Sequence, residues 1–490
     1  MAADEGSSGW REDTSDARTR LERVEHVVAR SPVTCPPSTS IGDVATLMAR
    51  ERISSVLIPH PDGMGIVTDR DLRTRVVAAR RDPESPVSDV MTPAVRTIPG
   101  SAMLGEAILV MLEGGFHHVP VTDGAGDVIG VVTDTDLIGI ERNSPFLLKR
   151  AIERAADPQG AIAVVAALPG VIRSMVRTGV DPVDVGYTVA LMTDALSRRL
   201  IELRSDELGA APVAWAWLAL GSEARREQGL HSDQDHAIAY DLPPGTDAAD
   251  VDPYFASLAE AVTADLEAAG IPRCEGLVMA TEQPLRRPLD HWTDAFRGWM
   301  EDVGTGGSFQ ASIVFDYRRI TGTLDAEPSL DAVLAEAPRH PSFGTHLAHR
   351  ALDERPPLKM FERIAIPRSG PHAMTVDVKH QGVLIVTGIA RAITVGRGIT
   401  SERGTIGRLR AAVDDVLDEA TVRELEDAFR FLWGVRLRHQ VERAAAGEEP
   451  DDRVDPRALG PVSRPALREA FRVIKRAQRA IAMEFGVRSG

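Results

Sequence analysis

Residues 221–235 read GSEARREQGLHSDQD, and a strand-like run lies on each side of them. The run before, Val213–Leu220 (VAWAWLAL), is apolar throughout, which predicts a buried strand that ends at a glycine. The run after, Asp235–Tyr240, predicts a second strand. The polar stretch therefore joins two strands of one domain.

Two aspartates, Asp233 and Asp235, stand at the entrance of the second strand. Because side chains alternate along a strand, both carboxylates are expected on one face, where they suit a hard divalent ion such as Mg²⁺. The turn at Gly221 and Ser222 permits close backbone approach, and a helix that starts there would offer N–H groups to a phosphate. The pattern indicates a site for a metal-bound nucleoside triphosphate; the alternative is a polar loop with two solvated aspartates.

The same residues carry a family resemblance. Gly221-Ser222 followed by Asp233-Gln-Asp235 resembles the signature of the polymerase-β-like nucleotidyltransferase superfamily. The fuller string resembles the branch in which a nucleotidyltransferase is fused to cystathionine-β-synthase (CBS) domains, distant relatives of PII uridylyltransferase and glutamine-synthetase adenylyltransferase. The residues that extend the match are Arg225, Glu227, Gln228 and Ser232.

The resemblance implies Mg²⁺-dependent (or Mn²⁺-dependent) nucleotidyl transfer of the uridylyl or adenylyl type. Asp233 and Asp235 would be the catalytic metal ligands, and a nucleoside triphosphate would be the donor. The nucleotide would be bound by Gly221, Ser222, Arg225 and Ser232. For Arg225 the alternative is a salt bridge with Glu227 or Glu223. The acceptor would be a protein or a small molecule.

An internal repeat precedes this domain. GIVTDRDL at Gly65–Leu72 recurs as GVVTDTDL at Gly130–Leu137, and each copy contains a predicted helix followed by two strands. The repeat resembles a tandem CBS pair. The helices are predicted at Ile41–Arg52 and Ala102–Gly114, and the strands at Ser55–Pro59, Gly65–Thr68, His118–Thr122 and Val128–Thr133.

CBS pairs commonly bind adenine nucleotides, so the resemblance implies AMP, ADP or ATP as a ligand and a homodimer formed through the pair. Thr68 and Thr133 would contact phosphate or ribose, and Asp71 and Asp136 would accept hydrogen bonds from ribose hydroxyls. The alternative is that the two threonines, or the aspartates that follow them, are helix N-caps.

The fold class expected is multidomain α/β plus all-α. The predicted order is a disordered tail (1–20), the tandem CBS pair (21–143), a helical connector (144–204), a nucleotidyltransferase core with a mixed sheet (205–320) and a C-terminal helical domain (321–490). Within the core, Leu277–Ala280 is predicted to be a further strand.

Two further groups of residues are candidates for the site. The superfamily often uses a third carboxylate, and Asp316 is the candidate metal ligand; the alternative is an ion pair with Arg318 or Arg319. In the C-terminal half, a polar run would either form a solvated basic face or clamp the triphosphate or acceptor. It comprises Arg436, Arg438, His439 and Gln440.

Composition limits the class of protein. The chain has 490 residues, a formal net charge of −16 and 43% hydrophobic residues, which fits a globular protein and argues against a general nucleic-acid binder. Two cysteines form no disulfide framework, and no run of 18 apolar residues suggests a membrane span. A cytoplasmic location with no membrane partner is predicted.

Together these patterns predict a cytoplasmic signalling nucleotidyltransferase that adenine nucleotide regulates through the CBS pair. Two alternatives stay open. In one, the transferase fold only binds and senses nucleotides; in the other, the chain is a scaffold whose assembly responds to the CBS ligand.

Overall fold

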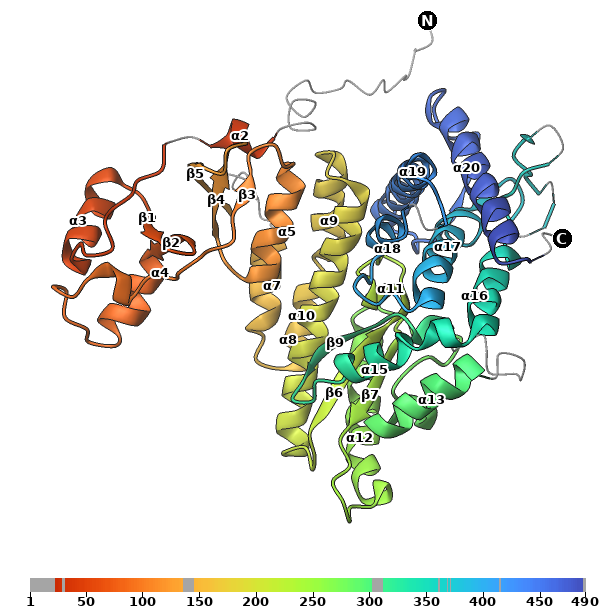
Figure 1. Ribbon diagram of the computed structural model, residues 1–490, viewed down its shortest axis with the longest axis horizontal. Coiled ribbons are helices and arrows are strands. Elements are labelled where there is room, and N and C mark those ends of the chain that lie inside the picture. Colours follow the sequence, from red (N-terminus) through yellow and green to blue (C-terminus); the bar gives the residue numbers. More distant parts are fainter. Residues whose placement is uncertain are drawn as a thin grey trace, which may run out of the picture. The chain divides into compact units, whose positions relative to one another are not determined.

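The computed structural model describes residues 23–28, 31–134, 145–301, 312–359, 362–367, 369–370, 372–413 and 416–487. The predicted tail at 1–20 and the predicted ligand residue Asp136 lie outside these ranges. The chain divides into two compact units: residues 1–146 with 177–180, and residues 147–176 with 181–490. Figure 1 labels the elements of both units.

The first unit contains the two copies of the repeat. In each, the strands run antiparallel, β1 with β2 and β4 with β5, and a two-residue strand, β3, pairs parallel with β4 in the second copy. A hydrogen bond of 2.7 Å between Ser54 Oγ and His118 Nε2 links the copies. The elements are α2 (Val24–Val27), α3 (Ile41–Glu51), β1 (Ser55–His60), β2 (Gly63–Thr68), α4 (Asp69–Asp71), the π-helix η1 (Leu72–Val77), η2 (Val87–Asp89), β3 (Ile98–Pro99), α5 (Leu104–Gly114), β4 (His118–Thr122) and β5 (Val128–Thr133).

The start of the second unit is helical. It consists of α7 (Pro145–Glu153), α8 (Pro158–Val165), α9 (Leu168–Arg177) and the long α10 (Pro182–Leu208). Among the described residues one stretch, Pro158–Arg177, is long and apolar enough to cross a membrane by length and composition alone. It is divided between α8 and α9, and a single stretch of this kind is weak evidence, because helices of soluble proteins pass the same test.

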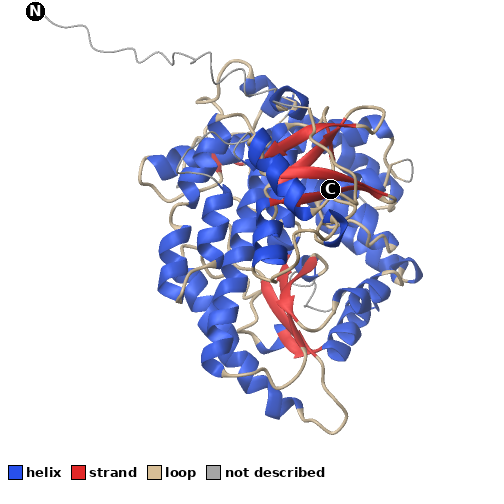
Figure 2. Cartoon of the chain, turned by 90° about the vertical axis from the view of Figure 1, so that its left-hand side faces the viewer, coloured by secondary structure: helices blue, strands red, loops and turns tan. Residues whose placement is uncertain are grey.

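A four-stranded sheet packs among helices of the second unit, and its strands are among those coloured red in Figure 2. Its order is β8-β7-β6-β9; β6 runs antiparallel to both neighbours and β7 runs parallel to β8, so the predicted mixed sheet is confirmed. Every residue of β6 is buried, as its apolar sequence predicts. The elements are β6 (Trp215–Leu220), α11 (Gly221–Ala224), β7 (His236–Tyr240), α12 (Ala248–Ala268), η3 (Gln283–Leu285), β8 (Arg286–Pro288), α13 (Leu289–Glu301) and β9 (Tyr317–Gly322).

The strand predicted at Leu277–Ala280 is not formed. Leu277 has a φ of 57°, and the fourth strand lies further along the chain, in β8. The loop still contacts the sheet, because the amide of His236 donates to the carbonyl of Val278 at 3.0 Å.

The C-terminal part is helical, as predicted, and two short strands, β10 and β11, pair antiparallel within it. Apolar faces of α19 and α20 are buried at helical spacing, Leu425 and Phe429 on one helix and Leu467 and Phe471 on the other. The elements are α15 (Glu327–Leu334), η4 (Ala337–Arg339), α16 (Pro341–Asp353), β10 (Val376–Asp377), the π-helix η6 (Lys379–Val383), α17 (Leu384–Thr394), η7 (Val395–Arg397), α18 (Thr405–Ala411), α19 (Glu419–Ala445), β11 (Arg453–Val454) and α20 (Ser463–Glu484).

Candidate functional site

The structure brings Asp233 and Asp235 together at the start of β7. One carboxylate oxygen of each lies, with the thiol of Cys274, in a group whose atoms are all within 4.8 Å of one another. Asp235 is buried, and its Oδ1 atom accepts no hydrogen bond from the described residues. An unpartnered buried carboxylate oxygen beside a second carboxylate is a position that a cation would satisfy.

Burial and negative charge dominate the electrostatics of this group. Burial and then the charge of Asp233 raise the pKa of Asp235 to about 7, against the opposing effects of the Cys274 thiol, Lys379 and Arg225. Burial and the charge of Asp235 raise the pKa of Cys274 to about 12, so this sulfur stays protonated and can donate to the carboxylate. With the thiol protonated, the two carboxylates are an oxygen donor set that fits Mg²⁺ or Mn²⁺.

Glycine is required at position 221, beside Asp233 and Asp235, which we call the acidic pair. Its φ is 53°, and a β-carbon at this position would lie 2.8 Å from Asp235 Oδ2 and 3.0 Å from Ile313 Cγ2. Its amide donates to the carbonyl of Asp316 at 3.0 Å, so this N–H group is already engaged. Ser222, the next residue, is half-buried in the four-residue helix α11.

Arg225 forms the salt bridge that was the alternative to phosphate binding. Its Nε atom donates to Glu227 at 2.8 Å, and Glu227 also accepts from the amide of Thr405 at 2.6 Å and from its hydroxyl at 2.9 Å. Arg225 is buried, with 4% of its side chain exposed. These contacts give Arg225 and Glu227 a structural role, which is to fix the loop after β6 onto α18.

Asp316 lies at the centre of an arginine cluster, which we define as Arg225, Arg391 and Arg408. Each of the three guanidinium groups donates to its carboxylate at 2.5 Å. Although burial opposes ionisation, the three arginines hold the pKa of Asp316 well below its usual range.

This position corrects the prediction for Asp316. Both oxygens of Asp316 are occupied by the arginine cluster, and the group of possible metal ligands in the described residues does not include it. The alternative named the wrong partners as well. Arg318 instead binds Asp194 on α10 at 2.8 and 2.9 Å, and Arg319 lies 3.9 Å from Asp325.

Two further predicted residues, Ser232 and Gln440, form hydrogen bonds with the backbone of the loop between β6 and β7. Ser232 is buried, and its hydroxyl accepts from the amide of Gly229 at 2.9 Å. Leu230 donates to Gln440 Oε1 at 3.0 Å, and Gln440 Nε2 donates to Asp452 at 2.7 Å. The C-terminal polar run is therefore not one solvated face, because part of it packs against the loop.

The other members of that run divide between buried and exposed positions. Arg436 is buried and binds Asp452 at 2.6 Å, whereas Arg438 is exposed and donates to the carbonyl of Gly434 at 3.1 Å. His439 is hydrogen-bonded to Asp451 at 2.7 Å. The contacts do not bring these three side chains to the acidic pair.

The predicted CBS ligand residues make local contacts in the first unit. Thr68 and Asp71 form a capping box, in which the Thr68 hydroxyl accepts from the amide of Asp71 at 3.4 Å and Asp71 Oδ2 accepts from the amide of Thr68 at 3.0 Å, so the N-cap alternative is confirmed for the first copy. Thr133 pairs with His118 across β4 and β5. The capping contacts do not exclude a ligand role, which stays a prediction.

Glu223, which the sequence suggested only as a possible partner of Arg225, is a buried carboxyl. Burial, followed by the charge of Asp194, raises its pKa to about 8, although Arg318 opposes the shift. Because the folded state keeps a proton that the unfolded state has lost, the free energy of unfolding should fall as pH rises toward 8. Between pH 6 and pH 8 we expect Glu223 to lower the free energy of unfolding of the wild type by roughly 2 kcal/mol. The Glu223→Gln variant should not show this contribution.

The measurement is denaturant unfolding at several pH values. Glu202→Gln is the matched control, because Glu202 is exposed and forms a surface ion pair with Arg199. It should retain the pH dependence of the wild type. A Glu223→Gln variant with the same slope as the wild type would show that Glu223 is already ionised at pH 6.

Three family models match the chain. The model "CBS domain" matches residues 24–78 and 87–142. The model "Putative nucleotidyltransferase DUF294" matches residues 166–305, and "Putative nucleotidyltransferase substrate binding domain" matches residues 341–485. The acidic pair lies in the second of these regions, and Lys379 and Gln440 lie in the third.

Individual relatives match over shorter stretches. An uncharacterized protein of Methanopyrus kandleri is 30% identical over 26% of this chain and 66% of its own length. The CBS domain-containing protein CBSCBSPB1 of Arabidopsis thaliana is 34% identical over 29% of this chain, and the match covers 25% of that relative. Among solved structures, a CBS domain protein of Pyrobaculum aerophilum complexed with AMP is 27% identical over 26% of this chain and 96% of its own, with a TM-score of 0.23.

Proposed function

Because the chain belongs to the family in which a CBS pair is fused to a DUF294 nucleotidyltransferase domain and its substrate-binding domain, we propose that it transfers a nucleoside monophosphate from a nucleoside triphosphate to an acceptor hydroxyl. The observation that carries the proposal is the pair Asp233 and Asp235 with its unpartnered buried oxygen. We assign the donor to the uridylyl or adenylyl class and the acceptor to a protein or a small molecule.

Each residue of the site has a stated part in this proposal. Bound Mg²⁺ or Mn²⁺ would neutralise charge on the phosphate oxygens. Asp233 and Asp235 would hold the ion, and Gly221 keeps the space next to Asp235 free of a side chain. Lys379, which lies close enough to lower the pKa of Asp235, adds a positive charge from the C-terminal part of the chain. In-line attack by the acceptor oxygen on the α-phosphorus would form the new ester and release pyrophosphate.

The test uses the purified chain, Mg²⁺, cell extract and each of the four nucleoside triphosphates, labelled in turn at the α- or the γ-phosphate. Nucleotidyl transfer puts α-label on a product and γ-label in pyrophosphate. Label transferred from the γ-position would instead indicate a kinase. Absence of Mg²⁺-dependent pyrophosphate release with all four nucleotides and the extract would contradict the proposal.

We further propose that adenine nucleotide at the CBS pair regulates the transferase. A ligand can change the second site only if it binds two conformations of the chain unequally, and linkage then makes the effect reciprocal. AMP is expected to change the triphosphate affinity of the acidic site by about 5-fold or more. The Asp71→Ala, Asp136→Ala variant should weaken AMP binding and lose the effect.

Titration calorimetry of the triphosphate, with and without AMP, measures this coupling in both proteins. AMP is the better probe because it does not carry the triphosphate that the acidic site is proposed to bind. Equal triphosphate affinity in all four conditions would show that the CBS pair and the transferase are thermodynamically independent.

One observation favours a second candidate function, a chain that binds nucleotides without transferring them. The third carboxylate often used by the superfamily is here enclosed by the arginine cluster, so two carboxylates remain for the metal. A binding-only protein would show Mg²⁺-dependent triphosphate binding with no release of pyrophosphate. The same labelled-nucleotide assay therefore decides between the two functions.

A further inference from the structure

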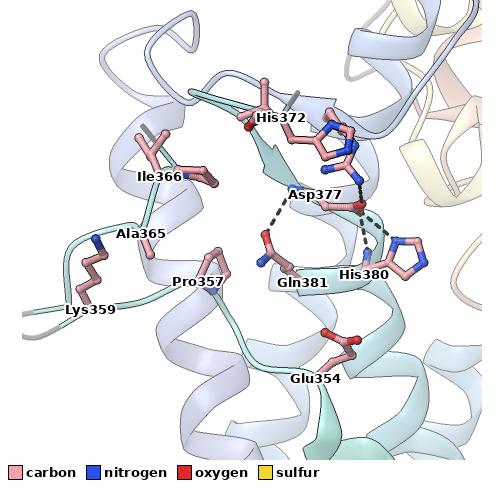
Figure 3. A pocket seen from close by; sticks show the side chains of 12 residues that line it. Glu354, Pro357, Lys359, Ala365, Ile366, His372, Asp377, His380 and Gln381 are labelled. Carbon is pink, nitrogen blue, oxygen red and sulfur yellow. Dashed lines mark hydrogen bonds and ion pairs between the residues drawn. The ribbon is translucent and has the colours of Figure 1, made fainter. Parts of the chain in front are cut away.

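A cavity of about 530 Å³ opens in the C-terminal part of the second unit, in the region matched by the substrate-binding model. Cavities of roughly 300–1,000 Å³ are typical of small-molecule sites. Its polar side chains come from the segment after α16, from β10 with η6, and from β11, and they include Lys359, His372, Asp377, His380, Gln381 and Arg453. Figure 3 shows Lys359 on the opposite side of the cavity from Asp377 and His380.

Asp377 organises the polar wall of the cavity. It accepts a hydrogen bond from the amide of His380 at 2.9 Å and lies 3.2 Å from His380 Nδ1 and 3.5 Å from Arg453 Nη2. Its own amide donates to Gln381 Oε1 at 3.3 Å (Figure 3). The carboxylate is therefore engaged by residues of the wall and fixes the directions of His380 and Arg453.

The cations of the wall retain capacity to bind an anion. The only ion pair of Arg453 within the described residues is the 3.5 Å contact with Asp377, although a guanidinium has five N–H donors. Lys359 is exposed and has no ion pair within the described residues. The hydrogen bond to Asp377 raises the pKa of His380, although burial opposes the shift. Among the described residues that line the cavity, Glu354 is the one carboxyl besides Asp377. Positively charged side chains therefore dominate, and the wall favours a ligand with negative charge.

The segment from Asp377 to Gln381 connects the cavity with the acidic pair. Asp377, His380 and Gln381 line the cavity, whereas the charge of Lys379, between them in sequence, acts on Asp235. A second connection runs through Asp452, the residue before β11. Its carbonyl accepts from the amide of Val378 at 3.0 Å, and its carboxylate accepts from the side-chain amide of Gln440. Gln440 in turn accepts from the amide of Leu230. The cavity and the acidic pair thus share the same short supporting segments.

We propose that this cavity binds the acceptor of the reaction, a small molecule whose carboxylate or phosphate group is held by Arg453 and His380 with Lys359 opposite. This assignment of the acceptor rests on the proposed function. The role of Asp377 is to position Arg453 and His380. A planar guanidinium suits both kinds of anion, because either presents two oxygens to its parallel N–H groups.

The first test measures thermal stabilisation of the full-length chain by inorganic phosphate and, separately, by succinate, in EDTA and at constant ionic strength. Stabilisation by an anion that binds the folded state follows mass action. The wild type should melt at a higher temperature with at least one anion, and Arg453→Ala should bind that anion about tenfold more weakly, the factor expected for a lost charged hydrogen bond. The anion that stabilises more strongly identifies the acceptor as phosphorylated or carboxylated.

Two variants serve as controls, each compared with its own melting temperature without anion. Arg457→Ala removes an arginine of the same region whose one ion pair in the described part of the chain is with Asp455, and it should respond like the wild type. Arg453→Lys keeps the charge but not the planar fork and should give an intermediate response. No shift in the wild type, or the same shift in Arg453→Ala, would overturn the proposal.

The second test separates this proposal from the proposed transfer reaction. The Asp233→Asn, Asp235→Asn variant should keep the stabilisation by anion, since no nucleotide or metal takes part in it. Conversely, Arg453→Ala should keep Mg²⁺-dependent triphosphate binding and lose transfer of α-label to a small product. Transfer to a protein band that Arg453→Ala leaves unchanged would show that the cavity does not hold the acceptor.

Discussion

Replacement of Asp233 and Asp235 together by asparagine is expected to reduce nucleotidyl transfer by a factor on the order of 10³ or more. Asparagine keeps the shape of each side chain but removes the two charges that would hold the metal ion. Stability should not fall, because the charge of Asp233 raises the pKa of buried Asp235 and the two carboxylates repel each other. The expected combination is an inactive protein with an unchanged or higher melting temperature.

The measurement is α-label transfer together with thermal unfolding, without added metal. Asp241→Asn is the matched control, because Asp241 is an exposed aspartate at the opposite end of β7. It should leave both quantities unchanged. Full transfer activity in the double variant would remove the acidic pair from the reaction.

Asp316→Asn is expected to be strongly destabilising, by about 3–5 kcal/mol, because it leaves the three guanidinium groups of the arginine cluster, two of them buried, without their carboxylate. Asp316 is fully buried, and the arginines it holds come from the loop after β6, from α17 and from α18. The change therefore weakens the attachment of the helical part to the sheet as well as the local ion pairs.

Denaturant unfolding of Asp316→Asn measures this effect. Asp325→Asn is a matched control in the segment after β9, since Asp325 is 65% exposed and lies 3.9 Å from Arg319. An exposed pair of this kind contributes about 1 kcal/mol at most. If the two variants lose similar stability, the arginine cluster is not the structural centre that its contacts indicate.

The sequence predicts the elements of the site well where the signal is local. The apolar run of β6 and the alternation at the start of β7 place both aspartates on one face, and the repeated strands of the first unit follow from two similar segments. These features depend on neighbouring residues, whose spacing the sequence states directly. The loop at Leu277–Ala280 was mispredicted because four apolar residues fit a strand or a buried turn equally well.

The tertiary partners of the site were not predictable in this way. Cys274, Lys379 and Thr405 reach the signature loop, residues 221–235, from distant parts of the chain, and no spacing rule connects them with it. Arg391 stands in α17 among apolar residues, where one arginine gives no sign that it binds Asp316. A polar residue within an apolar helix was the available signal, and it indicates a buried partner without identifying it.

The long-range contacts of the signature loop have a consequence for biosynthesis. Glu227 is held by Thr405, 178 residues further along the chain, and Leu230 by Gln440, 210 residues further along. Until a ribosome has translated α17 and α18, the buried carboxylates of Glu227 and Asp316 lack the partners that these two helices supply. The sheet of the nascent chain therefore stays incompletely packed until the helical part has emerged from the exit tunnel.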